Sequence, residues 1–318
     1  MSGPVVCGID ATWRSSRVLA VASALSTRAG LQMRALHAVA ATEERVLWMR
    51  DERIRSMIAD TPGRNDVPIV LEYGDAAERL TAATASASIL VIGSRGSPLG
   101  RSAPRRGVLT AVLRRSACPV VVVPRRADPE LKGSSMVCAV RDRTDIATAA
   151  TAACWADQLG LDLVLAAIAR PPRAPLVAGV STVPPPPVAR VRDTVTATEH
   201  ELAGLAGDIA AIARADCVTV PRPSPGRALL RIAQDADAAL IVLGPTRKRA
   251  VLAALTGSPT RSLLRSSECP LMICPATENV LAARMLHADS SDVVAASAPR
   301  APVSDGVRRA RDRRDRRR

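Results

Sequence analysis

Aromatic side chains are almost absent from this chain. Among its 318 residues there is no Phe, one Tyr and three Trp, so the packing of any core must rest on Ala, Val, Leu and Ile. Hydrophobic residues nevertheless make up 47% of the sequence, which is ample for the two domains of ordinary size that this length suggests. Because β-branched residues favour strands and Ala and Leu favour helices, this composition predicts an α/β fold.

Metal-binding and disulfide patterns are also lacking. The seven Cys are an odd number in a chain too long for a disulfide scaffold, and none stands in Cys-x-x-Cys spacing. The three His, at positions 37, 200 and 287, are isolated from one another and from any Cys pair. We therefore expect no metal site, and we interpret the cysteines as reduced, buried, small hydrophobic residues.

Targeting, membrane-spanning and catalytic signatures are missing as well. The amino terminus has no basic region before an apolar stretch, and no apolar run approaches the roughly 18 residues of a membrane span. We therefore expect a soluble, cytoplasmic protein without a transmembrane segment. There is no Gly-x4-Gly-Lys-[Ser/Thr], Gly-x-Gly-x-x-Gly or Gly-x-Ser-x-Gly motif, and no His ends a predicted strand beside a Ser or Cys. The sequence thus offers no catalytic residues and predicts a protein that is not an enzyme.

What the chain does contain is an internal repeat. The segment ASILVIG at 87–93 returns as AALIVLG at 238–244, and CPVVVVP at 118–124 returns as CPLMICP at 269–275. Both pairs are offset by 151 residues, so the stretch between them is in register too. Because the sequence repeats, the same type of site is expected in both copies.

In each copy, short apolar runs alternate with segments whose apolar residues recur at helical spacing. Such alternation with short connections predicts a parallel sheet covered by helices on both faces. The expected strands lie at 5–9, 31–39, 69–71, 89–92 and 120–123 in copy one, and at 136–140, 161–168, 217–220, 240–243 and 271–274 in copy two. The expected helices lie at 15–30, 43–58, 76–87 and 108–116, and at 146–159, 188–214, 226–236 and 258–266.

These elements divide the chain into a first domain at 1–128 and a second at 135–276. The stretch 171–187 holds seven prolines and is expected to be an extended loop. Residues 277–318 are expected to be a disordered tail, and its last segment, 307–318, holds eight Arg and two Asp. Two interpretations of that Arg-rich end stay open: a solvated charged terminus, or weak, salt-sensitive contact with nucleic acid or an anionic surface.

The fourth strand of each copy runs into a glycine-bearing loop and then a helix. Glycines after a strand let the backbone approach a ligand closely, and the amides at a helix start bind phosphate. In copy two, Ser258 is the expected N-cap and Pro259 the first helical residue, an arrangement that pre-forms an anion site.

Together with VCGID at 6–10, these segments resemble a tandem member of the universal stress protein family. The resemblance covers about 4–125 and 135–276. It implies two Rossmann-like domains, each with its own five-stranded parallel sheet flanked by helices, paired in pseudo-twofold fashion through their fifth strands. It also implies a non-enzymatic stress-response role in which ATP or AMP is bound rather than turned over.

The resemblance further implies a set of nucleotide-binding residues. ATP-binding members of the family carry Gly-x2-Gly-x9-Gly-[Ser/Thr] after the fourth strand and an Asp at the end of the first strand. Val39, which ends the expected second strand, is also counted among the nucleotide-binding residues. The implied residues are Asp10, Val39, Gly93, Gly96, Gly107, Gly244, Gly257, Ser258 and Thr260.

Each copy departs from the family pattern in its own way. In copy one, Arg106 stands at the third glycine position, and a glycine follows one residue late. In copy two, Arg247 replaces the second glycine, and Arg141 occupies the position of Asp10, with Asp142 one residue later. Copy one therefore matches the family pattern better where the ribose would bind, and copy two matches it better where the phosphates would bind.

Three functions stay open at this point. The first is non-enzymatic binding of adenine nucleotide, and the second is a structural or interaction protein whose loops have lost the ligand. The third is an ATP-hydrolysing or adenylyl-transferring enzyme. Added Arg and Lys residues around the loops are either phosphate contacts that replace lost glycine amides or solvated charges. The expected partners are the nucleotide, the other domain of the same chain and a second copy in a homodimer.

Overall fold

The computed structural model describes residues that all belong to one compact unit, Met1–Ala283. The described residues are 3–10, 12, 15–39, 47–60, 67–94, 107–169, 188–221, 225–244, 263–264 and 266–275. The proline-rich stretch at 171–187, the tail at 277–318 and most of the helix expected at 258–266 lie outside them.

Strands and helices alternate along the amino-terminal half, as the apolar pattern predicts. The elements are β1 (Val5–Ile9), α1 (Ser15–Ala29), β2 (Met33–Val39), α2 (Leu47–Ala59), β3 (Ile69–Tyr73), α3 (Ala76–Ala83), β4 (Ile89–Gly93), α4 (Val108–Arg115) and β5 (Val120–Val123). The third strand runs two residues beyond the expected one, because Glu72 and Tyr73 continue the pairing with β2.

The carboxyl-terminal half repeats the plan. Its elements are β6 (Ser135–Val140), the short 3-10 helix η2 (Arg143–Asp145), α5 (Ile146–Leu159), β7 (Asp162–Ala169), α6 (Val188–Asp208), β8 (Ala215–Pro221), α7 (Pro225–Asp235), β9 (Ala238–Leu243) and β10 (Leu271–Ile273). The helix expected to reach residue 214 ends at Asp208. None of the helices in the described ranges has both the length and the apolar character needed to cross a bilayer.

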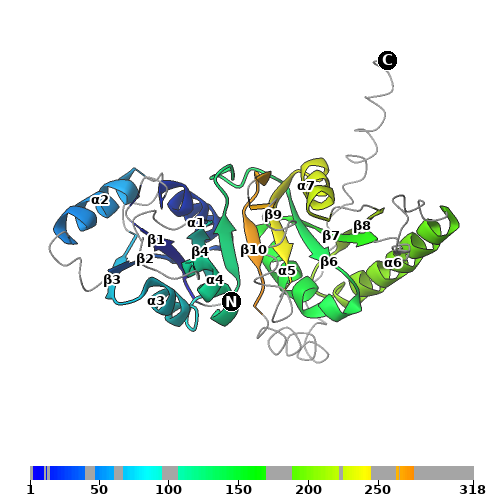
Figure 1. Cartoon of the computed structure of the whole chain (residues 1–318), viewed down its shortest axis with the longest axis horizontal. Helices are drawn as coiled ribbons and strands as arrows, with labels where there is room; N and C mark the ends of the chain where they lie inside the picture. Colours follow the sequence, from blue (N-terminus) through cyan, green and yellow to red (C-terminus); the bar gives the residue numbers. More distant parts are fainter. Residues whose placement is uncertain are drawn as a thin grey trace, which may run out of the picture. The chain divides into compact units, whose positions relative to one another are not determined.

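The ten strands form a single sheet in the order β3-β2-β1-β4-β5-β10-β9-β6-β7-β8. Every pairing within a half is parallel, and β5 pairs with β10 in antiparallel fashion, with Val121 opposite Met272. Figure 1 shows β10, in orange, in the middle of the sheet. The α/β class and the contact between the fifth strands are therefore confirmed.

The expectation of two separate sheets is wrong. Each half alone would leave its fifth strand as an apolar edge with unpaired backbone groups, and such edges attract another strand. Pairing β5 with β10 satisfies those groups and leaves Val120–Val123 almost fully buried. The two halves therefore meet through backbone hydrogen bonds as well as side-chain packing.

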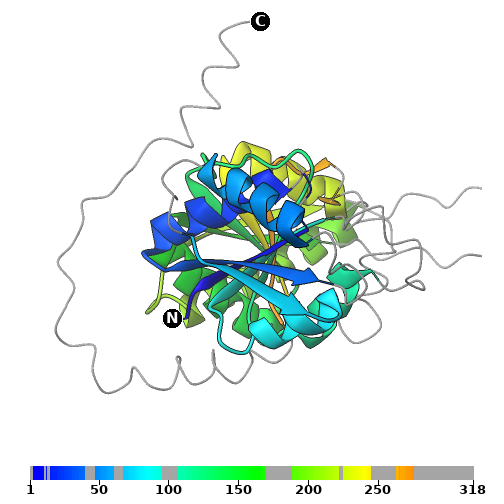
Figure 2. The same cartoon turned by 90° about the vertical axis from the view of Figure 1, so that its left-hand side faces the viewer.

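Helices cover both faces of this sheet, as Figure 2 shows for the amino-terminal half. On one face of that half, α3 and α4 pack on a core that includes Leu36, Leu90 and Val122. On the same face of the other half, α7 packs on Val137 and Ile241, and Leu264 adjoins both clusters. The opposite face carries α1 and α5, which contact each other.

One close backbone contact occurs at the same place in both halves. A Cβ added to Gly3, just before β1, would lie 2.3 Å from the Ser86 carbonyl oxygen. A Cβ added to Gly133, just before β6, would lie 2.3 Å from the Ala239 nitrogen and 2.4 Å from the Asp237 carbonyl oxygen. Glycine at these positions allows the chain just before the first strand of each half to pack closely against the turn that precedes the fourth strand of that half.

Candidate functional site

The strand order reverses direction at one point in each half. In the amino-terminal half, β1 lies between β2 and β4. The chain therefore adds β2 and β3 on one side of β1, and then β4 and β5 on its other side. Ligands of open parallel sheets bind beyond the carboxyl ends of the strands at such a point. Asp10 directly follows β1, and Gly93 ends β4. The register that pairs Cys7 with Val91, continued by two residues, places the ends of these strands side by side.

The Asp10 carboxylate is held in one orientation by its own loop. Its Oδ1 atom accepts hydrogen bonds from the Thr12 backbone N–H at 3.1 Å, the Thr12 hydroxyl at 2.6 Å and the Ser15 hydroxyl at 2.8 Å. The buried Ser15 hydroxyl oxygen in turn accepts the Asp10 N–H at 3.1 Å. These bonds fix the turn from β1 into α1, and all three donors to the carboxylate converge on a single one of its oxygens.

The carboxyl-terminal half has the same turn, but its Asp is the second residue after the strand instead of the first. Asp142 Oδ1 accepts hydrogen bonds from the Thr144 backbone N–H, at 2.9 Å, and from the Thr144 hydroxyl. This is the arrangement that Asp10 and Thr12 make in the other half. In local hydrogen bonding, Asp142 is therefore the counterpart of Asp10, although Arg141 is the first residue after the strand.

Arg141 is held by Asp145, at the start of α5. The Asp145 carboxylate accepts the Arg141 backbone N–H at 2.8 Å, its Nε–H at 3.0 Å and an Nη2–H at 2.5 Å. The hydrogen bond to Asp145 raises the pKa of the Arg141 guanidinium above its already high usual value. Asp145 is buried, and its carboxylate is paired with the Arg141 guanidinium, as a buried charge requires.

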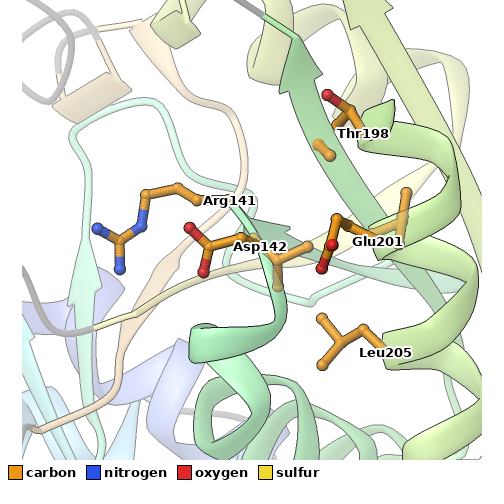
Figure 3. Close-up of a pocket in the computed structure, with 8 residues that line it drawn as sticks. Arg141, Asp142, Thr198, Glu201 and Leu205 are labelled. Carbon is orange, nitrogen blue, oxygen red and sulfur yellow. The ribbon is translucent and has the colours of Figure 1, made fainter. Parts of the chain in front are cut away.

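A shallow groove lies beside this pair, between the ends of β6 and β7 and the helix α6. It measures about 150 Å³ including space open to solvent, and Asp142, Thr198, Glu201 and Leu205 line it. Figure 3 shows the Arg141 guanidinium directed away from Glu201 and Leu205, so this side chain does not fill the groove. Ligand pockets usually measure about 300–1,000 Å³, so the groove alone is too small for a nucleotide.

The glycines of the expected site have different structural surroundings. Gly244 follows β9, and a Cβ there would lie 2.7 Å from the Thr148 hydroxyl oxygen of α5, so a larger residue would require the Thr148 side chain to move. Gly107, at the start of α4, has a negative φ of −58° and open space where its Cβ would be. Gly93 and the buried Val39 end β4 and β2.

The remaining expected residues, Gly96, Gly257, Ser258 and Thr260, lie outside the described residues. Among the residues that are described, no group of three or more His, Cys, Asp or Glu side chains is arranged to hold a metal ion.

Sequence reasoning missed the residues that support these turns, namely Thr12, Ser15, Thr144 and Asp145. A signal for part of them was present, because Asp-x-Thr occurs after the first strand of each copy, at 10–12 and 142–144. Asp followed two residues later by a hydroxyl residue is typical of a turn closed by the Asp side chain. The Arg141–Asp145 pair left no comparable signal, since spacing of four residues between opposite charges is common on helices.

Comparison with known proteins identifies the two halves as copies of one family unit. The model of the universal stress protein family matches residues 1–124 and 145–275. No curated protein matches the chain.

Solved structures with the same fold include two that extend over nearly the whole chain. A universal stress protein from Archaeoglobus fulgidus DSM 4304 is 16% identical, with a TM-score of 0.55, over 86% of this chain and 97% of that one. The functionally unknown protein PA1789 from Pseudomonas aeruginosa PAO1 is 13% identical, with a TM-score of 0.50, over 91% and 98%. A universal stress protein from Archaeoglobus fulgidus in complex with dAMP is 18% identical over 44% and 97%, with a TM-score of 0.31 that is too low for comparing sites.

Proposed function

The chain belongs to the universal stress protein family, and from this membership we propose that it binds an adenine nucleotide, ATP or AMP, in its amino-terminal half. The proposed site lies beyond the carboxyl ends of β1, β2 and β4 and includes Asp10, Val39 and Gly93. The protein acts in a cytoplasmic stress response by holding the nucleotide, not by turning it over. Gly96 and Gly107 complete the proposed phosphate side.

The orientation of Asp10 is the observation that carries this proposal. Three donors from Thr12 and Ser15 converge on its Oδ1 atom, so the carboxylate is fixed before any ligand arrives. A carboxylate fixed in this way is suited to accept hydrogen bonds from the two hydroxyls of a ribose. A binding group that is already ordered loses little conformational entropy on binding, which favours affinity.

The carboxyl-terminal half differs at the corresponding place. The first residue after β6 is Arg141, and its charge is balanced by Asp145 through a bidentate ion pair. The carboxylate of Asp142 is displaced by one residue, beside Glu201 in the groove below α6. Two carboxylates near each other disfavour a polyphosphate, so we place the nucleotide in the amino-terminal half. The loop with Gly257, Ser258 and Thr260 is proposed as an anion site only.

Isothermal titration calorimetry with ATP and with AMP tests this proposal on the full chain. Asp10→Asn keeps the Oδ1 acceptor for Thr12 and Ser15 but removes the charge. Since a hydrogen bond to a charged group contributes about 1.5–3 kcal/mol, the variant is expected to bind roughly 10–100-fold more weakly. The matched control is Asp142→Asn, which is expected to bind as the parent does.

Other outcomes decide between the remaining functions. If the parent binds neither ATP nor AMP, the protein is a structural or interaction protein whose loops have lost the ligand. Equal loss in Asp10→Asn and Asp142→Asn would mean that both halves hold nucleotide. Release of phosphate from ATP above a buffer control, abolished by Gly93→Val, would instead identify an ATP-hydrolysing enzyme.

A further inference from the structure

The strand β3 forms one end of the ten-stranded sheet. Its side chains Leu71 and Tyr73 are 39% and 54% exposed, and they are the large hydrophobic side chains that lie exposed in the described part of the chain. Figure 1 shows β3 at the far end of the amino-terminal half, away from the junction of the halves. Both exposed side chains therefore lie on a strand that no other described strand flanks on its outer side.

The hydrogen bonds to β2 show which backbone groups of β3 face outward. The Ala35 N–H donates to the Pro68 carbonyl, and the Gly74 N–H donates to the Val39 carbonyl. In a parallel ladder, alternate residues of a strand face the same neighbour, so positions 68, 70, 72 and 74 face β2. The N–H and C=O groups of Ile69, Leu71 and Tyr73 consequently face away from the sheet.

We propose that β3 pairs in antiparallel fashion with β3 of a second copy of this chain, about a twofold axis at Leu71. In this register Leu71 faces Leu71 of the other copy, and Ile69 faces Tyr73. These are the same three residues whose backbone groups point outward, so the pairs that they form are the hydrogen-bonded ones of the ladder. The interface is isologous, as most dimer interfaces are.

The side chains suit this register. Ile69 opposite Tyr73 is a β-branched–aromatic pair, a combination that stabilises neighbouring strands. Glu72 falls opposite Val70, so the two Glu72 carboxylates do not face each other. Leu71 and Tyr73 share one face of the sheet with the buried Ala35 and Val39, and pairing would cover their exposed surface.

The other end of the sheet lacks these features. None of the large hydrophobic side chains that lie exposed in the described residues is on the edge strand β8. This strand ends at Pro221, and proline is a typical protection of an edge against pairing. Joining two edges in antiparallel fashion is also how β5 and β10 unite the halves of this chain. The second copy is therefore expected at β3 and not at β8.

Sedimentation equilibrium of the full chain tests the interface. The parent, whose chain mass is 33.4 kDa, is expected to behave as a dimer of twice that mass. Leu71→Lys places two like charges directly opposite each other and should weaken the dimer roughly tenfold or more. The control Cys217→Lys adds the same charge at an exposed position of β8 and should leave the dimer unchanged. Far-UV circular dichroism verifies that both variants are folded.

Disulfide trapping tests the register. Opposed residues in a hydrogen-bonded antiparallel pair have Cα atoms about 5.5 Å apart, within the usual span of a disulfide. In a Cys217→Ser background, Leu71→Cys should therefore form a covalent dimer on oxidation with copper–phenanthroline. Tyr73→Cys, at the more exposed of the two positions, should not form a covalent dimer because it faces Ile69. The double variant Ile69→Cys/Tyr73→Cys should form one.

Four results would overturn the proposal. The first is a monomeric parent, and the second is a dimer that Leu71→Lys leaves unchanged. The third is a dimer broken by Cys217→Lys, which would assign the interface to β8. A Tyr73→Cys dimer without a Leu71→Cys dimer would exclude the twofold axis at Leu71.

Discussion

Gly133 lies where an added Cβ would meet backbone atoms rather than a movable side chain. The nearest atoms are the Ala239 nitrogen at 2.3 Å and the Asp237 carbonyl oxygen at 2.4 Å. Overpacking of this kind costs about 1–3 kcal/mol or more, so Gly133→Ala is expected to lower the free energy of unfolding by at least that much in urea denaturation.

The matched control for Gly133 is Gly204→Ala, in α6. A Cβ there lies 3.5 Å from the Arg143 guanidinium, an ordinary contact distance. Since Ala favours a helix over Gly by up to about 1 kcal/mol, this variant should be neutral or more stable. Equal destabilisation of both variants would contradict the steric explanation.

The buried thiols of Cys7 and Cys138 make stability depend on pH. Burial raises the pKa of both thiols far above the usual value of 9.0. Above pH 9 the unfolded chain releases protons that the folded chain keeps, so this stability is present below pH 9 and is lost as the pH rises. The expected loss approaches about 1.4 kcal/mol per pH unit for each thiol.

Urea denaturation between pH 8 and pH 10 measures this loss of stability. The double variant Cys7→Ala/Cys138→Ala removes both thiols and should show a shallower fall in the free energy of unfolding over the same range. Identical slopes for the parent and the double variant would mean that other groups cause the pH dependence.

The helices α1 and α5 end in the same motif. Gly30 and Gly160 follow them with φ values of +65° and +64°, and the next N–H, of Leu31 or Leu161, donates to a carbonyl five residues earlier. A residue with a Cβ pays about 1–2 kcal/mol in this left-handed conformation. Gly160→Ala should therefore lower the thermal midpoint, while Gly160→Asn, which tolerates the conformation better, should lower it less. A midpoint unchanged by Gly160→Ala would exclude a requirement for glycine.

Helices and strands could be predicted from the sequence because their signals are local. The apolar pattern predicts a helix over Ile146–Leu159, and these bounds match those of α5. The union of the two sheets could not be predicted in this way. It depends on whether two edges that are 150 residues apart in the sequence meet, and the apolar pattern of β5 and β10 is the same whether they pair or pack face to face.

For the candidate site, the sequence predicted which residues follow each strand but not the contacts that their side chains make. The sequence register places Arg141 where Asp10 stands, and in the structure each directly follows its strand. The sequence did not reveal that Asp142 makes the turn that Asp10 makes, because hydrogen bonds depend on the direction of a side chain rather than on its position in a register. Nor did it reveal that Asp145 holds Arg141, since that contact depends on the turn of the chain at η2, which lies between the strand and the helix.

The pairing of β5 with β10 couples the stability of the two halves. Val121 and Met272 are opposite each other and fully buried, so Val121→Asp would bury an unpaired charge. Because the halves share one sheet, hydrogen exchange measured by mass spectrometry should become faster in β9 and β6 as well as in β4. Cys217→Asp, at an exposed position of the other edge strand β8, should affect only its neighbourhood. Unchanged exchange in β9 of Val121→Asp would show that the halves are energetically independent.

The same antiparallel pairing also determines where two occupied sites would point. Strands β1 to β5 all run one way and strands β6 to β10 all run the other way. The carboxyl ends of the two sets therefore lie on opposite rims of the sheet. A nucleotide bound in one half and an anion bound in the other would therefore lie at opposite rims of one sheet, with the paired strands β5 and β10 between them.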